Sequence, residues 1–169
     1  MKPFLNPIPR ILPLLLTLAA FAQASPAAYK VTWTTPSIDS LDSMPLSGRF
    51  GAGANVWVQD GSIWLYLAHN GAYDETGRLL KLGCIRLTPK SPNLGGEGFT
   101  QELDPSTGAI TIRQGAFKAT LWFAGETLVY ESTSDKEAPL EVAFGTWREK
   151  TKDGVLYDMF DRRDRITGD

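Results

Sequence analysis

The chain has 169 residues, of which 43% are hydrophobic and 21% are charged, and a formal net charge of −2. This composition is typical of a single globular domain and excludes disordered, collagen-like and coiled-coil proteins. With 17 basic and 19 acidic residues, the chain has no overall positive field for nucleic acid. The single cysteine, Cys84, and the single histidine, His69, exclude an internal disulfide framework and any site that needs two imidazoles. We therefore expect no metal site and no cofactor.

Residues 1–24 are predicted to be a secretory signal peptide. Lys2 and Arg10 form a basic n-region, and an apolar stretch follows at 11–21. That stretch is too short to cross a bilayer, which takes roughly 20 residues, and a small-x-small pattern ends at Ala24. We expect cleavage at the Ala24–Ser25 bond, export to the periplasm or the extracellular space, and no membrane contact after cleavage. A retained membrane anchor is the alternative.

The rest of the chain alternates apolar and polar residues with a period of two, which is typical of β-strands. Nine strands are predicted, at 29–33, 55–59, 62–67, 82–87, 99–103, 109–113, 117–123, 127–131 and 140–144. Asp60-Gly61 predicts a tight hairpin, and turn formers at 104–108 and 124–126 predict two more. The short, even spacing favours an all-β fold, an antiparallel β-sandwich or barrel.

One domain is expected over residues 25–147. Residues 148–169 are predicted to be a C-terminal tail or the start of a linker. Within that tail, acidic and basic groups alternate over 157–165, a pattern that predicts a short charged helix or a solvated tail.

The predicted strand at 62–67 is apolar on both faces. Ile63, Leu65 and Leu67 share one face, whereas Trp64 and Tyr66 share the other. Such a strand is either covered on both sides or presents its aromatic side chains to a partner.

The segment at 44–55 is rich in glycine, but it does not fit a phosphate-binding loop. Such a loop follows a strand and opens a helix, whereas this segment leads into a strand. We therefore assign Gly48, Gly51 and Gly53 to structural turns, where the backbone needs a positive φ or a close approach.

The remaining polar candidates lie in the turn after strand 62–67. His69 is predicted to be either a loop histidine with local hydrogen bonds or a sugar contact, with Asn70, Tyr73 and Asp74 as its neighbours.

Aromatic residues are the other candidate binding groups, because the C–H faces of sugar rings suit flat π surfaces. Trp64 and Tyr66 are the candidates for stacking on a sugar. Trp33, Trp57 and Trp122 are expected to pack in the core or on a sheet.

No catalytic residue is predicted. The chain lacks a nucleophile elbow. Asp39, Asp42 and Asp74 could serve glycoside hydrolysis only if two carboxyl groups lay about 5–10 Å apart across a sugar. Their neighbours make turn and capping roles the simpler interpretation.

Four segments carry a family resemblance: Trp33–Ser37, Ser43–Gly48, Gly51–Val58 and Gly77–Gly83. Through them, Tyr29–Leu87 resembles the N-terminal β-sandwich domain that precedes the helical-barrel catalytic domain in family 95 (alpha-L-fucosidase type) bacterial glycoside hydrolases. The likeness is greatest to the DUF5703 group.

The resemblance implies a twisted, supersandwich-like domain packed against an (α/α) barrel that holds the catalytic carboxylates. We expect this chain to lack that barrel and to be the non-catalytic partner that shapes its sugar site. The barrel would cover the second apolar face of strand 62–67. A free-standing carbohydrate-binding module is the main alternative. A small hydrolase using Asp39, Asp42 or Asp74 is the third.

Overall fold

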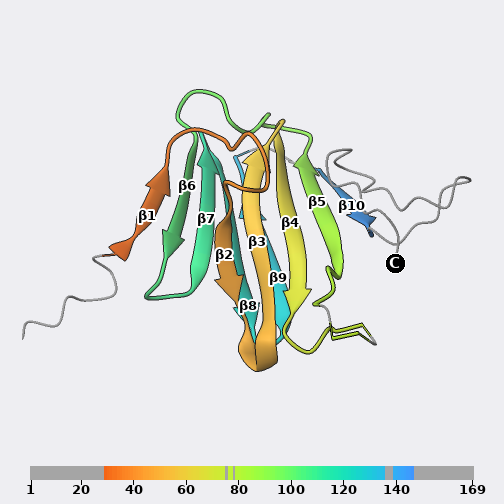
Figure 1. Cartoon of the computed structure of the whole chain (residues 1–169). Helices are drawn as coiled ribbons and strands as arrows, with labels where there is room; N and C mark the ends of the chain where they lie inside the picture. The colour runs from red at the N-terminus through yellow and green to blue at the C-terminus, as the bar shows by residue number, and fades with distance from the viewer. Residues whose placement is uncertain (1–28, 75, 78, 136–138, 147–169) are drawn as a thin grey trace, which may run out of the picture.

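The computed structural model describes residues 29–74, 76–77, 79–135 and 139–146. These residues form ten strands in two five-stranded antiparallel sheets that pack as a sandwich (Figure 1). Sheet A has the strand order β1-β6-β7-β8-β9, and sheet B has the order β10-β5-β4-β3-β2. The expected all-β antiparallel sandwich is therefore confirmed.

The strands of sheet A are β1 (Val31–Trp33), β6 (Thr100–Asp104), β7 (Ala109–Gln114), β8 (Phe117–Ala124) and β9 (Thr127–Thr133). Those of sheet B are β2 (Met44–Ser47), β3 (Ala52–Gln59), β4 (Ser62–His69), β5 (Gly83–Pro89) and β10 (Leu140–Gly145). A 3-10 turn, η2 (Arg49–Gly51), joins β2 to β3.

All nine predicted strands are present, with their ends shifted by a few residues. The predicted hairpin at Asp60-Gly61 joins β3 to β4, and both turn residues have positive φ, 50° and 75°. This is the backbone that a two-residue type I′ turn requires.

Strand β2 is the tenth strand, and the sequence prediction missed it. It lies inside the glycine-rich segment and contains Pro45, which cannot donate to a ladder and so usually argues against a strand. Here β2 is the outermost strand of sheet B, pairing with β3, and proline is tolerated at an edge. Met44 and Leu46 point inward and are 1% and 3% exposed.

The core lies between the two sheets and is built from alternate residues of each strand. Val56, Ile63 and Leu65 of sheet B and Ile110 and Leu121 of sheet A are completely buried. Each such side chain contributes about 1.5–3 kcal/mol through burial.

One polar side chain crosses this core. Gln101 of β6 is buried, and its Nε2 donates a 3.1 Å hydrogen bond to the carbonyl oxygen of Val56 in β3. The bond pairs two buried polar groups and ties sheet A to sheet B.

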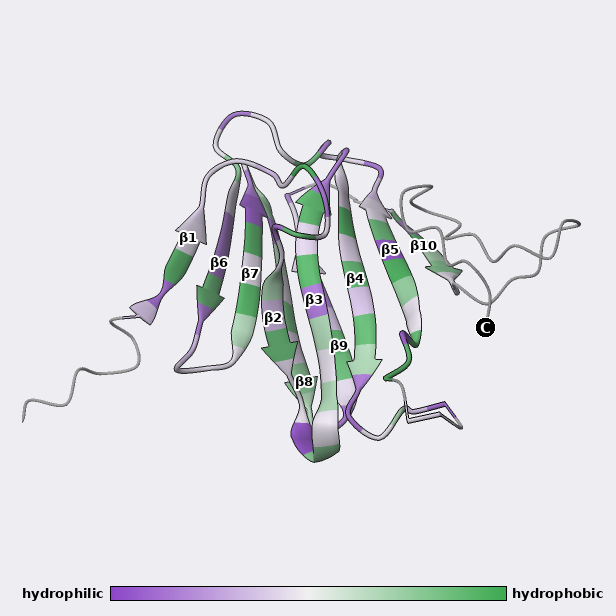
Figure 2. Ribbon diagram, in the orientation of Figure 1, coloured by the Kyte–Doolittle hydropathy of each residue, from purple (hydrophilic) through white to green (hydrophobic). Residues whose placement is uncertain are grey.

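The two sheets are offset, so sheet B extends beyond sheet A on one side. Across the core β2 packs opposite β7 and β8, which leaves β5 and β10 at the far edge (Figure 1). Val142 and Phe144 pair in register with Leu87 and Ile85 on the inward face, yet they are 61% and 62% exposed. Figure 2 shows that hydrophobic residues continue across sheet B onto β10. We call Val142 and Phe144 the edge patch.

Two of the three glycines assigned to structural turns have the predicted role. Gly51 has a φ of 93°, and a Cβ there would collide with the side-chain amide of Asn70. A Cβ on Gly48 would lie 2.7 Å from the carbonyl oxygen of Gly125. The assignment of Gly53 is wrong. This residue lies within β3, and the nearest atom to a Cβ, the Leu46 carbonyl oxygen, would be 3.5 Å away, an ordinary contact.

The predicted signal peptide at 1–24 and the predicted tail at 148–169 lie outside the described residues. Within the described residues, no helix is both long and apolar enough to span a membrane.

Candidate functional site

The outer faces of the two sheets differ in chemistry. On sheet A, the residues that alternate with the core are mainly polar, as with Thr111 and Arg113 on β7 and Lys118 and Thr120 on β8. On sheet B, the corresponding positions of β3 and β4 carry aromatic side chains. The outer face of sheet B is therefore the candidate functional surface.

Three aromatic residues on that face form a cluster. Trp57 and Trp64 are directly paired across β3 and β4, and their rings stack at 6.0 Å with an interplanar angle of 16°. Tyr66 meets Trp57 edge-on at 4.7 Å. Trp57 is only 2% exposed, which agrees with its predicted packing role, while Trp64 and Tyr66 are half-buried. Each such aromatic pair contributes about 0.5–1.5 kcal/mol to stability, in addition to the contribution of its buried area.

The indole N–H groups of this cluster have partners within the sheet. Trp57 Nε1 donates to Gln59 Oε1 at 3.0 Å, and Trp64 Nε1 donates to the Gln59 carbonyl oxygen at 3.2 Å. The Arg86 guanidinium lies 5.6 Å from the Trp64 ring centroid, in the range of a cation–π contact. The two tryptophans are thus fixed in place by internal contacts.

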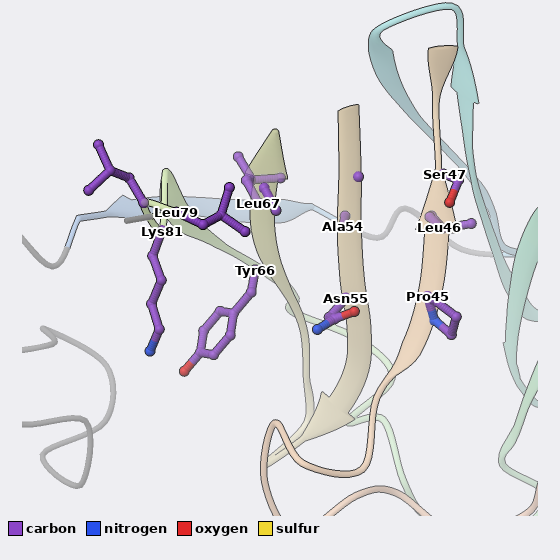
Figure 3. A pocket seen from close by; sticks show the side chains of 12 residues that line it. Pro45, Leu46, Ser47, Ala54, Asn55, Tyr66, Leu67, Leu79 and Lys81 are labelled. Atoms are coloured by element: carbon purple, nitrogen blue, oxygen red, sulfur yellow. The ribbon is translucent and has the colours of Figure 1, made fainter. Parts of the chain in front are cut away.

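Tyr66 also borders an open depression of about 400 Å³ on sheet B (Figure 3). Its floor contains small residues at adjacent positions on three strands: Ser47 of β2, Gly53 of β3 and Ala68 of β4. The absence of a side chain at Gly53 leaves room there, a use of this glycine that the sequence prediction did not foresee.

The walls of the depression combine apolar and polar groups. Pro45, Asn55 and Tyr66 line it from the sheet, and the segment 79–81 closes another side. The Tyr66 ring and the Asn55 amide, which are directly paired across β3 and β4, flank the same space (Figure 3). An apolar pocket with a few polar groups is typical of small-ligand sites.

The other predicted binding residues lie at the end of β4 (His69) and in the turn after it, and they do not line the depression. His69 Nδ1 accepts a 3.0 Å hydrogen bond from the Gly71 N–H, and His69 Nε2 lies 3.6 Å from Glu126 Oε1. Asp74 Oδ1 accepts from the backbone N–H and the hydroxyl of Thr76 at 2.9 and 2.7 Å. Tyr73 is exposed and forms an isolated bridge with Leu79.

The predicted stacking and polar candidates therefore occupy two places. Trp64 and Tyr66 lie on the face of sheet B. His69 ends β4, and Asn70, Tyr73 and Asp74 lie in the turn that follows. Sequence reasoning missed Asn55, Pro45 and Ser47. The period of two on β3 places Asn55 on the same face as Trp57, so that residue could have been found. Pro45 and Ser47 could not, because β2 was not recognised.

The candidate carboxylate residues lie in hydrogen-bonded turns. Asp39 Oδ1 accepts from the Leu41 N–H at 2.9 Å, and the Asp42 N–H donates to the Asp39 carbonyl oxygen at 3.3 Å. These are the turn contacts that the residue types predict. No group of three or more metal-ligating side chains occurs in the described part of the chain.

A family model, described as a domain of unknown function (DUF5703) and covering that family's N-terminal domain, matches residues 32–163. The chain belongs to the DUF5703 family. The match takes in nearly all of the sandwich, so the DUF5703 part of the predicted resemblance is confirmed. The DUF5703 match also runs past residue 147, where the sequence prediction placed the domain boundary. No curated protein matches the chain.

Proposed function

We propose that this chain is the non-catalytic N-terminal β-sandwich domain of an exported glycoside hydrolase. In this proposal it packs against the helical-barrel catalytic domain of that hydrolase and shapes the sugar site of that domain. The observation that carries the proposal is the edge patch, because two large apolar side chains lie on the inward face of the edge strand β10 with 61% and 62% of their surface exposed.

The position of the edge patch supports a partner that follows the sandwich in the same protein. The family model describes an N-terminal domain, and β10 is the last described strand. A domain attached after β10 is held next to Val142 and Phe144 at high effective concentration, so little additional affinity is needed for it to dock.

The roles of the carboxylates support the absence of catalysis from the described residues. Asp39 and Asp74 accept hydrogen bonds from the backbone N–H groups two residues further on, which is a structural use of a carboxylate. The cleavage chemistry is accordingly assigned to the partner domain.

The test is to mix the helical-barrel domain with this chain and measure kcat/KM for an aryl glycoside. We expect the chain to raise kcat/KM. The double variant Val142→Asp/Phe144→Asp should lose the effect, because a docked carboxylate would have to be desolvated. Leu41→Asp is the matched control, since Leu41 is 94% exposed and lies in the loop before β2. Equal kcat/KM with and without the chain would contradict the proposal.

The depression on sheet B favours a second candidate function, a carbohydrate-binding module. One aromatic ring beside an amide suits a sugar, whose C–H face stacks and whose hydroxyl groups form hydrogen bonds. For this function, titration with oligosaccharides should shift tryptophan fluorescence, and Tyr66→Ala or Asn55→Ala should abolish the shift. Tyr73→Ala is the control outside the depression. The absence of any shift would leave docking as the better proposal.

A further inference from the structure

Phe50 combines two properties that rarely occur together. It lies in the left-handed region, with φ 56° and ψ 19°, and its side chain is 78% exposed. A bulky residue at positive φ is strained, at a cost of about 1–2 kcal/mol relative to an ordinary backbone. An exposed side chain recovers little of this cost through burial. The strain is therefore not offset by packing within the sandwich.

The backbone around Phe50 is nevertheless held firmly. The Arg49 N–H donates to the Gly125 carbonyl oxygen at 2.8 Å, and the Gly51 carbonyl oxygen accepts from the Asn70 N–H at 3.0 Å. These bonds fix η2 between the β8–β9 hairpin loop and the turn after β4, at one end of the sandwich (Figure 1). We call η2 with these two loops, His69–Gly71 and Ala124–Glu126, the Phe50 tip.

The polar groups of the tip differ from those of a protein interface. Arg49, Asn70 and Glu126 are exposed and supply both hydrogen-bond donors and acceptors within the tip, whose one exposed aromatic ring is that of Phe50. A protein partner needs a buried patch of about 800 Å² with an apolar centre, which one phenylalanine does not provide. The net charge of −2 disfavours a nucleic acid.

We propose that the Phe50 tip is a carbohydrate-contacting site, in which a pyranose ring stacks on Phe50 and its hydroxyl groups bond to Arg49, Asn70 and Glu126. The choice of a sugar rests on the proposed function, while the site itself rests on the strain and exposure of Phe50. The rigid backbone presents the ring without an ordering cost on binding. The tip shares no residue with the edge patch or with the lining of the depression at Tyr66.

The test combines sugar binding with thermal stability in the whole chain. In NMR titrations with methyl glucoside, methyl galactoside and methyl fucoside, we expect millimolar binding and shift changes confined to the tip. Phe50→Gly and Phe50→Ala should weaken binding about fivefold, since a stacked ring contributes about 1 kcal/mol. Leu41→Ala, an exposed leucine at the opposite end of β2, should leave binding unchanged.

Stability separates a binding role from a structural one. Because glycine adopts positive φ freely, Phe50→Gly should raise Tm by about 3 °C while it weakens sugar binding. A lower Tm in Phe50→Gly would overturn the proposal, because it would mean that Phe50 stabilises the fold. Shift changes that map to Tyr66 and Asn55, or no shift changes at all, would also overturn it. Neither result bears on docking at the edge patch, which the kcat/KM measurement tests independently.

Discussion

Gly51 and Gly53 lie two residues apart and differ in what a Cβ would meet. At Gly51 the new atom would collide with the Asn70 amide on a backbone with a φ of 93°, whereas at Gly53 the nearest atom is 3.5 Å away. The sequence could show that this segment is rich in glycine. It could not show at which position the backbone requires glycine, because that depends on the side chain of Asn70, which lies just after β4.

This pair gives a matched prediction. Gly51→Ala should lower the free energy of unfolding by about 2 kcal/mol, because alanine is strained at positive φ and must displace Asn70. Gly53→Ala should change the free energy of unfolding by less than about 0.5 kcal/mol. Urea unfolding followed by circular dichroism measures both. An equal loss of unfolding free energy in the two variants would show that the backbone at Gly51 does not require glycine.

At the scale of single elements, the period of two was enough to find nine strands and three hairpins. It failed at β2, where Pro45 hides the alternation of Met44 and Leu46. Missing β2 also left part of the site unpredicted, because β2 provides one side of the depression. Recognising that proline is tolerated on an edge strand requires the sheet order, which a single sequence does not contain.

The contact between β1 and the β6–β7 hairpin predicts a pH dependence. Lys30, just before β1, lies 3.0 Å from Asp104 Oδ2 and 3.1 Å from Glu102 Oε1. The hydrogen bond from the Ser106 hydroxyl, together with that from Lys30, lowers the pKa of Asp104 from 3.8 to about 2. The folded state therefore favours the ionised carboxylate, and this stabilisation is present above about pH 4 and lost as the pH falls towards 2.

Tm measured between pH 5 and pH 2 tests this linkage. Asp104→Asn should reduce the fall in Tm between about pH 4 and pH 2, and it should have its main effect there. Ser106→Ala should act in the same direction but less strongly, because it removes one of the hydrogen bonds that lower the pKa of Asp104. If the Tm of Asp104→Asn falls with pH as steeply as that of the wild type, the acid sensitivity arises from other groups.

At the scale of the whole molecule, the outer faces of the two sheets differ in chemistry. Sheet A presents a mainly polar outer face, and sheet B presents an aromatic cluster, a depression and the edge patch. From the sequence, the second apolar face of β4 predicted that something covers sheet B. The structure places Trp57 in contact with both Trp64 and Tyr66 on that face. The largest exposed apolar side chains lie elsewhere, on β10 and in exposed loops.

That difference arises from the offset between the sheets. Alternation along β10 assigns Val142 and Phe144 to an inward face, but only the packing of β2 opposite β7 and β8 determines how far sheet A reaches. A sequence can therefore indicate which residues face inward without indicating whether anything lies opposite them.

Hydrogen–deuterium exchange tests the docking proposal most directly. It compares this chain alone with an intact protein in which the helical-barrel domain follows it. We expect the barrel to slow exchange at the edge patch, in β10, and to leave β1 at the other side of the sandwich unchanged. Exchange at Val142 and Phe144 that is equally fast with and without the barrel would contradict docking at this edge.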